Sequence, residues 1–276
     1  MSEPKSDSIR VHVVLSVLLI AIHFVLSLVL PQEFDAWIYL IYLAAPIVAV
    51  LWGIYTSREY AGSSLSSLAL ITGGLGCWLG GELVWYYLDY IANANPYPSA
   101  ADFLWLAGYP LIFFGIIGKI KRTKAGFYDL RAKAALFAAL ALGIVVAYFG
   151  IRVPFEAGGS APEIIIAVLY NVGDLVLISS AVYLFAASLS FEGGSLAKSY
   201  LLMVLAITAI LLADVLFSIL GEEYIAGTGA LSAAMDSLWM AGYLLFFISF
   251  EEMLSAKRRA AEKLLSYNLR SKKRTG

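Results

Sequence analysis

Long apolar runs alternate along the chain with short polar or Gly/Pro-containing segments. A membrane-spanning helix needs about 20 mostly apolar residues. Eight runs meet this requirement, at approximately 11–30, 34–56, 64–92, 101–118, 132–153, 162–189, 196–220 and 230–250. The first run is followed by Leu30-Pro-Gln-Glu-Phe34 and not by a small-residue cleavage pattern, so it is predicted to be a retained helix. The pattern predicts an all-α polytopic membrane protein with eight transmembrane helices.

The composition agrees with this prediction and excludes several other classes of protein. Of the 276 residues, 61% are hydrophobic and only 14% are charged. A soluble domain is about half apolar and about a quarter charged, so an ordinary water-soluble globule and a disordered chain are both excluded. The single cysteine, Cys77, excludes an intramolecular disulfide.

The distribution of basic residues predicts the orientation of the eight spans. With both ends on one side, that side carries 18 of the 19 Lys and Arg residues, and only Arg152 lies on the other. Cytoplasmic segments of membrane proteins carry such an excess. We therefore expect a multi-pass protein of the plasma membrane with both termini in the cytoplasm. The predicted parts are an N-terminal segment at 1–10, a membrane domain at 11–250 and a basic cytoplasmic tail at 251–276.

The chain contains an internal repeat. Residues 102–111 and 236–245, which are 134 positions apart, are identical at seven of ten positions. Leu79–Trp85 aligns with Leu211–Phe217 at an offset of 132. Each copy is a four-helix unit, at about 11–118 and 132–250. Because four is an even number, both copies enter the membrane in the same direction, and a parallel repeat about an axis along the membrane normal is expected.

The repeated motif places Asp, Trp and Tyr at i, i+3 and i+7, on one face of a helix. The Ala-Gly pair before each Tyr would let a neighbouring backbone come close. Glu82, Trp85 and Asp89 are predicted to form a comparable stripe. The stripes predict an outward-facing pocket for a small molecule or a cation. The motif residues are Asp102, Trp105 and Tyr109 in the first copy and Asp236, Trp239 and Tyr243 in the second.

Each of these residues also has a structural interpretation. Ser99 and Asp102 have the spacing of a helix capping box, and Trp and Tyr are common anchors at the membrane interface. Glu82, Asp174 and Asp214 lie about ten residues from a loop, where capping cannot explain them. Each of these three must pair with a hydrogen-bond donor, be protonated, bind a cation or line a wet cavity.

Several other chemistries lack the residues that they need. His12 and His23 lie on one predicted helix, so neither a zinc site nor a two-helix haem site is expected. No lysine lies inside a span to form a Schiff base. The pair Glu251-Glu252 has no histidine beside it and is expected to be solvated in a loop. We therefore expect no catalytic residue, metal or cofactor.

The tail carries eight basic residues with leucines at helical spacing between them. A basic amphipathic helix on anionic lipid head groups is one interpretation, and docking to a cytoplasmic partner is another. Candidate residues for either contact are Lys257, Arg258, Arg259 and Lys263.

The membrane part of the chain resembles the eight-helix sensor region that precedes GGDEF and EAL domains in cyclic-di-GMP signalling proteins and some histidine kinases. The resemblance covers about residues 34–250, and the order and spacing of its motifs carry it. The resemblance implies a detector, here without the output domain that follows in that family. The matching segments are Gly81–Tyr87, Asn95–Leu111, Tyr170–Leu177, Leu212–Asp214 and Asp236–Tyr243.

Three functions are thus open at the level of sequence. The first is a sensor that passes an extracytoplasmic or membrane-borne signal to a separate cytoplasmic signalling protein. The second is a small permease or cation-coupled transporter that uses the intramembrane carboxylates. An intramembrane lipid-modifying enzyme ranks last, because no nucleophile or metal set can be assembled. The expected partners are the bilayer and a cytoplasmic protein, with self-association open and no nucleic acid.

Overall fold

The computed structural model describes residues 6–60, 65–122, 130–156, 158, 160–189, 196–225 and 229–275. These ranges are almost entirely helical and hold no strand. Two short segments, the 3-10 turn η1 and the π-helical turn η2, lie next to the long helices. The elements are α1 (Ser6–Val29), η1 (Gln32–Phe34), α2 (Asp35–Glu59), α3 (Leu65–Tyr86), η2 (Tyr87–Ile91), α4 (Ala100–Arg122), α5 (Leu130–Glu156), α6 (Ala161–Leu189), α7 (Ala197–Ile225) and α8 (Ala230–Thr275).

Seven helices are long and apolar enough to cross a membrane, namely α1 to α4 and α6 to α8. The all-α prediction is therefore confirmed, and the chain has the architecture of a multi-pass membrane protein. Helix α5 covers the expected span 132–153 but is not among the seven, so the eighth span stays a prediction. The connecting segments 61–64, 123–129 and 190–195, which contain part of the predicted cytoplasmic charge, lie outside the described residues.

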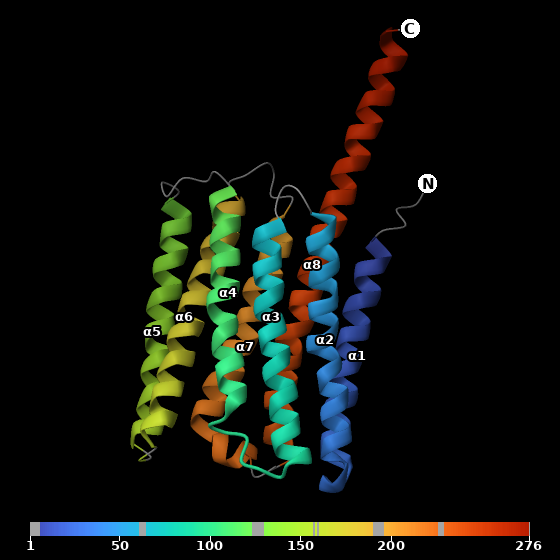
Figure 1. Ribbon diagram of the computed structural model, residues 1–276. Coiled ribbons are helices and arrows are strands. Elements are labelled where there is room, and N and C mark those ends of the chain that lie inside the picture. The colour runs from blue at the N-terminus through green and yellow to red at the C-terminus, as the bar shows by residue number, and fades with distance from the viewer. Residues whose placement is uncertain are drawn as a thin grey trace.

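The helices stand side by side in one bundle, and neighbours in sequence pack as antiparallel pairs (Figure 1). Helix α3 packs against α4, α5 against α6, and α7 against α8. Contacts of α2 with α8 and of α4 with α6 join the two halves of the chain. Both termini lie at one end of the bundle, called here the terminal end (Figure 1).

Glycines at equivalent positions in the two copies of the motif allow α4 to pack closely against α3 and α8 against α7. A Cβ atom on Gly108 of α4 would lie 2.4 Å from Trp78 Cδ1 and 2.8 Å from the Gly74 carbonyl oxygen of α3. A Cβ atom on Gly242 of α8 would lie 2.4 Å from Ile210 Cγ1 of α7. The prediction that the Ala-Gly pairs allow close backbone approach is confirmed.

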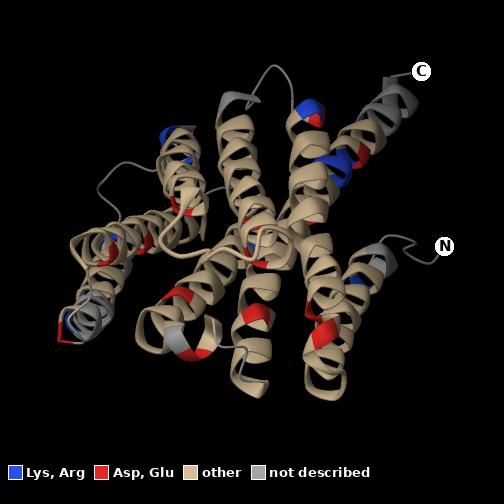
Figure 2. Ribbon diagram, turned by 60° about the horizontal axis from the view of Figure 1, so that its bottom comes forward, with Lys and Arg blue, Asp and Glu red and all other residues tan. Residues whose placement is uncertain are grey.

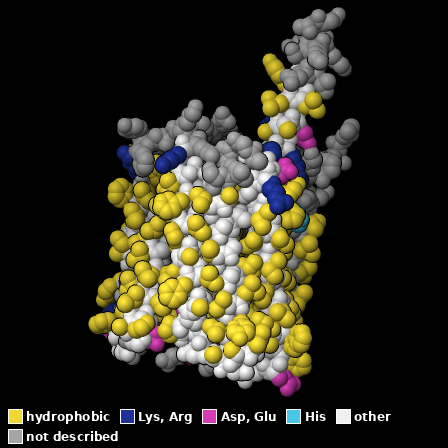
Figure 3. All heavy atoms as spheres, viewed as in Figure 1, with side chains coloured by type: hydrophobic (Ala, Val, Ile, Leu, Met, Phe, Trp, Pro, Cys, Tyr) yellow, Lys and Arg dark blue, Asp and Glu magenta, His cyan; other side chains and the backbone are white. Residues whose placement is uncertain are grey.

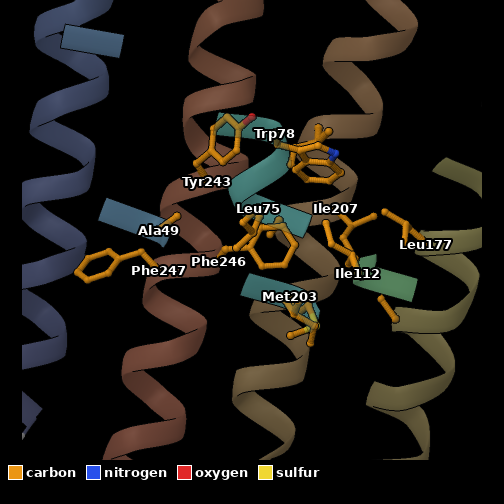
Figure 4. Packing of buried hydrophobic residues seen from close by; sticks show 14 of the residues in the cluster. Ala49, Leu75, Trp78, Ile112, Leu177, Met203, Ile207, Tyr243, Phe246 and Phe247 are labelled. Carbon is orange, nitrogen blue, oxygen red and sulfur yellow. The ribbon is translucent and has the colours of Figure 1, made fainter. Parts of the chain in front are cut away.

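Apolar side chains from α3, α4, α7 and α8 fill the middle of the bundle. Leu75, Ile112, Met203, Ile207 and Phe246 are fully buried and pack into one layer (Figure 4). Trp78 and Tyr243 lie beside this apolar layer, each one turn further from the terminal end. The apolar layer therefore separates the terminal end from the region around Trp78 and Tyr243.

The outer surface suits lipid. Large apolar side chains, including Leu18 on α1 and Leu51 on α2, are exposed along the sides of the helices (Figure 3). Lys and Arg gather toward the terminal end, while Asp and Glu also lie at mid-height and at the opposite end (Figure 2). Arg152, near the end of α5 away from the termini, pairs with Glu156 at 2.7 Å.

Helix α8 continues far beyond the expected end of the last span at residue 250. It is one helix of 46 residues that leaves the bundle at the terminal end (Figure 1). Ala, Lys, Arg and Glu, which follow residue 255, are strong helix formers, so the change from apolar to charged sequence does not end the helix. The basic tail is thus a continuation of α8 and not a separate segment, and its side chains from Lys257 to Tyr267 are exposed.

The expectation that Glu251 and Glu252 are solvated is wrong, because both side chains are buried. Trp52 Nε1 donates to Glu251 at 2.9 Å. Glu252 accepts hydrogen bonds from Lys198 Nζ at 3.0 Å and from Arg259 Nη2 at 2.7 Å. These five residues form a clamp that ties α8 to α2 and α7 where it leaves the bundle.

Candidate functional site

A cavity of about 600 Å³ lies in the half of the bundle away from the termini. It extends from loop residues such as Asn95 and Gly158 inward to Trp78 and Ile210, where the apolar layer closes it. A volume of this size is typical of a small-molecule site. Aromatic and carboxylate side chains from α2, α3, α4, α6, α7 and α8 make up most of its lining.

Eight of the ten predicted ligand-binding residues line this cavity. The other two do not line it: Asp174 is buried and Asp236 is partly buried, and each contacts a lining tyrosine. Asp89 does not line the cavity either, although Glu82 and Trp85 do. It lies in η2, where the wider π-helical turn changes the register of the stripe. The eight are Glu82, Trp85, Asp102, Trp105, Tyr109, Asp214, Trp239 and Tyr243.

Glu82 of α3 accepts hydrogen bonds from three tyrosine hydroxyls. Tyr39 of α2 donates to Oε2 at 2.8 Å, while Tyr42 of α2 and Tyr243 of α8 donate to Oε1 at 3.0 Å and 2.8 Å. The carboxylate thereby joins three helices. No Lys or Arg contributes to this set of contacts, so hydroxyl dipoles alone face the carboxylate.

Tyr109 of α4 joins two carboxyl groups in the other half of the chain. Its hydroxyl lies 2.9 Å from Asp174 Oδ1 of α6 and 3.0 Å from Asp214 Oδ2 of α7. A hydroxyl has one hydrogen, so both contacts are hydrogen bonds at once only when one carboxyl group is protonated and donates to Tyr109 Oη. Trp239 Nε1 donates to Asp214 Oδ1 at 2.8 Å.

The motif aspartates have different environments in the two copies. The backbone N–H of Ser99 donates to Asp102 Oδ2 at 2.7 Å, and Ser99 Oγ accepts from the N–H of Ala101. The predicted capping box is therefore confirmed, and Tyr170 adds a third hydrogen bond by donating to Asp102 Oδ1 at 3.0 Å.

Asp236, the equivalent residue in the second copy, has side-chain neighbours instead of a capping box. It accepts a hydrogen bond from the Tyr224 hydroxyl at 2.7 Å. His23 Nε2 of α1 lies 3.7 Å from the other carboxyl oxygen of Asp236. The histidine side chain is buried.

Aromatic rings form one wall of the cavity. We call Trp85, Trp105, Phe217, Tyr224 and Trp239 the aromatic wall. Tyr224 meets Trp239 at 84° and Phe217 at 73°, with ring centroids 5.6 Å and 5.5 Å apart. Trp85 meets Trp105 at 5.7 Å between centroids. The nearly perpendicular rings present both faces and edges to their surroundings.

Tyr97, from the loop between η2 and α4, packs its ring edge-on against Phe217 at 5.4 Å. Its hydroxyl donates to the Glu163 carbonyl oxygen at the start of α6. Burial, and secondarily the charges of Asp102 and Glu163, raise the pKa of Tyr97 to about 12, so this hydroxyl remains a neutral donor at physiological pH.

The tail candidates lie away from the cavity, on the exposed part of α8 at the clamp and beyond it. Arg259 belongs to the clamp, and Lys257 pairs with Glu59 of α2 at 3.3 Å. Arg258 and Lys263 are exposed. Lys257 and Arg259 thus hold the first turns of the tail against the bundle and against Glu252 of α8.

Sequence reasoning missed most of the tyrosines that hold the carboxylates. Tyr39, Tyr42, Tyr170 and Tyr224 were not among the predicted candidates, although all four line the cavity. Tyr39 and Tyr42 have the i, i+3 spacing of a single helical face, which was the available signal. Glu82, Asp174 and Asp214 are hydrogen-bonded to Tyr or Trp side chains of other helices, which corresponds to the first of the four alternatives that the sequence left open.

No family model, curated protein or solved structure matches the chain. Among the residues that the structure describes, no group of three or more His, Cys, Asp or Glu side chains is placed to hold a metal ion. The side chains of the site combine ring faces with hydrogen-bonded carboxyl groups.

Proposed function

We propose that this protein is a membrane receptor-like module that binds a small ligand from the extracytoplasmic side and relays its presence to a cytoplasmic partner. The observation that carries the proposal is the continuity of α8. The same helix presents Trp239 and Tyr243 to the cavity and extends, through the clamp, into an exposed basic tail. A packing change at the cavity has a direct physical route to the tail.

The proposal includes eight spans in the plasma membrane, with both termini cytoplasmic. The gathering of basic residues at the terminal end supports this orientation. It places the cavity on the outer side of the membrane and the tail on the inner side.

A parallel repeat of two four-helix units is also part of the proposal. Tyr243 donates to Glu82, and its counterpart Tyr109 contacts Asp214, the counterpart of Glu82. The contact of α2 with α8 corresponds in the same way to that of α6 with α4. These matching contacts support an axis between the halves, with the cavity beside it.

The resemblance to the sensor regions of cyclic-di-GMP signalling proteins supports the receptor proposal over a permease. The apolar layer does so too, because it closes the cavity toward the terminal end. In addition, Glu82 and Asp214 accept hydrogen bonds from Tyr or Trp and so contribute to helix packing. Proteoliposome flux that is lost when Glu82, Asp174 and Asp214 are neutralised would instead indicate a transporter.

Hydrogen exchange of the clamp and tail tests the relay. The variant Trp239→Phe removes the indole donor to Asp214 at the cavity, and we expect altered amide exchange in residues 251–263. Trp37→Phe is the matched control, because Trp37 lies on α2 with 68% of its surface exposed to the outside of the bundle. Exchange in 251–263 that is the same in both variants and the parent protein would contradict the relay.

A further inference from the structure

We infer that the cavity selects an organic cation with an apolar or aromatic body, such as a quaternary ammonium compound. This inference rests on the proposed function and names the class of ligand for the same cavity. It is carried by the residues that enclose the cavity and by the sign of their charges.

Aromatic rings are the main component of the enclosure. Twelve of the 25 lining residues are Trp, Tyr or Phe. The aromatic wall brings rings together at steep angles, as in sites where a cation contacts several ring faces. The negative face of a ring attracts a cation and repels an anion, so such a wall discriminates by charge.

The charged lining residues are all acidic. Glu82, Asp102, Glu163, Asp214 and Glu223 line the cavity, whereas Lys, Arg and His are missing from its described lining. The carboxyl groups whose partners are given above receive hydrogen bonds from hydroxyl, indole or backbone N–H groups, which leave any negative charge uncompensated. An anionic ligand would find no basic group there, and a cation would find both carboxylates and ring faces.

The depth of the site favours an organic cation over a metal ion. Glu82 and Asp214 line the cavity together with Trp85, Trp105 and Trp239, and both carboxyl oxygens of each are already hydrogen-bonded. Mg²⁺ and Ca²⁺ require several oxygen ligands at once. A quaternary ammonium ion requires none, because it is held by ring faces and by the field of nearby carboxylates.

Tryptophan fluorescence offers a direct test with the full-length protein in nanodiscs. Four of the six tryptophans line the cavity, namely Trp78, Trp85, Trp105 and Trp239. The probes are benzyltrimethylammonium, its neutral isostere 2,2-dimethylpropylbenzene, and phenylacetate as an anion of similar size. We expect saturable quenching by the cation, about tenfold weaker binding of the neutral isostere, and no saturable response to the anion.

Two variants test whether the cation binds in the cavity. Asp214→Asn is expected to weaken binding of the cation about tenfold while that of the neutral isostere changes little. Trp37→Phe, remote from the cavity, is the matched control and is expected to bind like the parent protein. A thermal unfolding curve followed by circular dichroism shows whether Asp214→Asn is folded. If it is not, Trp239→Phe takes its place, with the same loss expected.

The outcomes separate this inference from the proposed function. Equal affinity for the cation and its neutral isostere, or failure of the cation to bind, overturns the cation inference and leaves the relay test untouched. If the cation binds as expected but exchange in residues 251–263 does not respond to it, the ligand class stands and the proposed relay fails.

Discussion

At the scale of single residues, the main finding is how buried carboxylates are accommodated without basic partners. Three tyrosine hydroxyls, two from the first half of the chain and one from the second, surround Glu82, and Tyr109 of the first half contacts Asp174 and Asp214 of the second. A buried acceptor that receives several hydrogen bonds retains most of the stabilisation it has in water. Removing such an acceptor leaves its donors buried without partners.

The variant Glu82→Leu tests this account. It leaves the hydroxyls of Tyr39, Tyr42 and Tyr243 without their acceptor, and we expect a loss of about 2–4 kcal/mol in the free energy of unfolding. Replacing the three tyrosines with Phe in the same background removes the unpaired donors and should restore part of this loss. Unfolding by SDS titration, followed by circular dichroism, measures both effects. If the losses in unfolding free energy from Glu82→Leu and from the three Tyr→Phe substitutions simply add, the hydrogen-bonded network is contradicted.

The sequence predicted the carboxylates better than their partners. Glu82, Asp174 and Asp214 stand out because a carboxyl group far from a loop is expensive in a membrane span. Tyr39 and Tyr42 do not stand out, because tyrosine is common in spans and interfaces. Which tyrosine meets which carboxylate depends on the rotation of separate helices, and that is decided by packing across the bundle.

At the scale of helices, hydropathy predicted the positions of the long helices, and the repeated motif predicted their close contacts. Hydropathy did not predict where α8 ends, because it reports compatibility with lipid and not helix propensity. Ala260, Ala261, Glu262 and Lys263 are poor membrane residues but good helix formers. The burial of Glu251 and Glu252 was also missed, since their partners come from α2, α7 and the next turns of α8.

Glycine substitutions test the close contacts of α3 with α4 and of α7 with α8. Gly108→Ala and Gly242→Ala would each place a methyl group 2.4 Å from a neighbouring side chain. We expect each to lower the free energy of unfolding by about 1–3 kcal/mol. Gly76→Ala on α3 meets nothing within 4 Å and serves as the control, with a neutral or slightly stabilising effect. Equal effects at all three positions would argue against specific packing.

At the scale of the whole molecule, the charge distribution and the bundle together predict where each end faces. Cysteine labelling in intact cells tests this, in a Cys77→Ala background with single cysteines introduced at Asn95, Gly158 or Leu264. We expect membrane-impermeant maleimide to label Asn95→Cys and Gly158→Cys from outside, and Leu264→Cys only after permeabilisation.

The result at Gly158 decides whether α5 crosses the membrane. If α5 does not cross, the segment before α6 lies on the cytoplasmic side, and Gly158→Cys is protected in intact cells. The two termini then face opposite sides. Such a pattern would contradict the eight-span topology and the parallel repeat together.

The length of α8 has a mechanical consequence. A helix of 46 residues is about 69 Å long, more than twice the ~30 Å thickness of the hydrocarbon core. Pivoted at the clamp, the last 20 or so residues act as a lever arm of about 30 Å. A tilt of about 5° at the pivot would displace Thr275 by roughly 3 Å and Trp239, about 18 Å from the pivot on the other side, by roughly 1.5 Å, so a movement around Trp239 would be nearly doubled at the end of the tail.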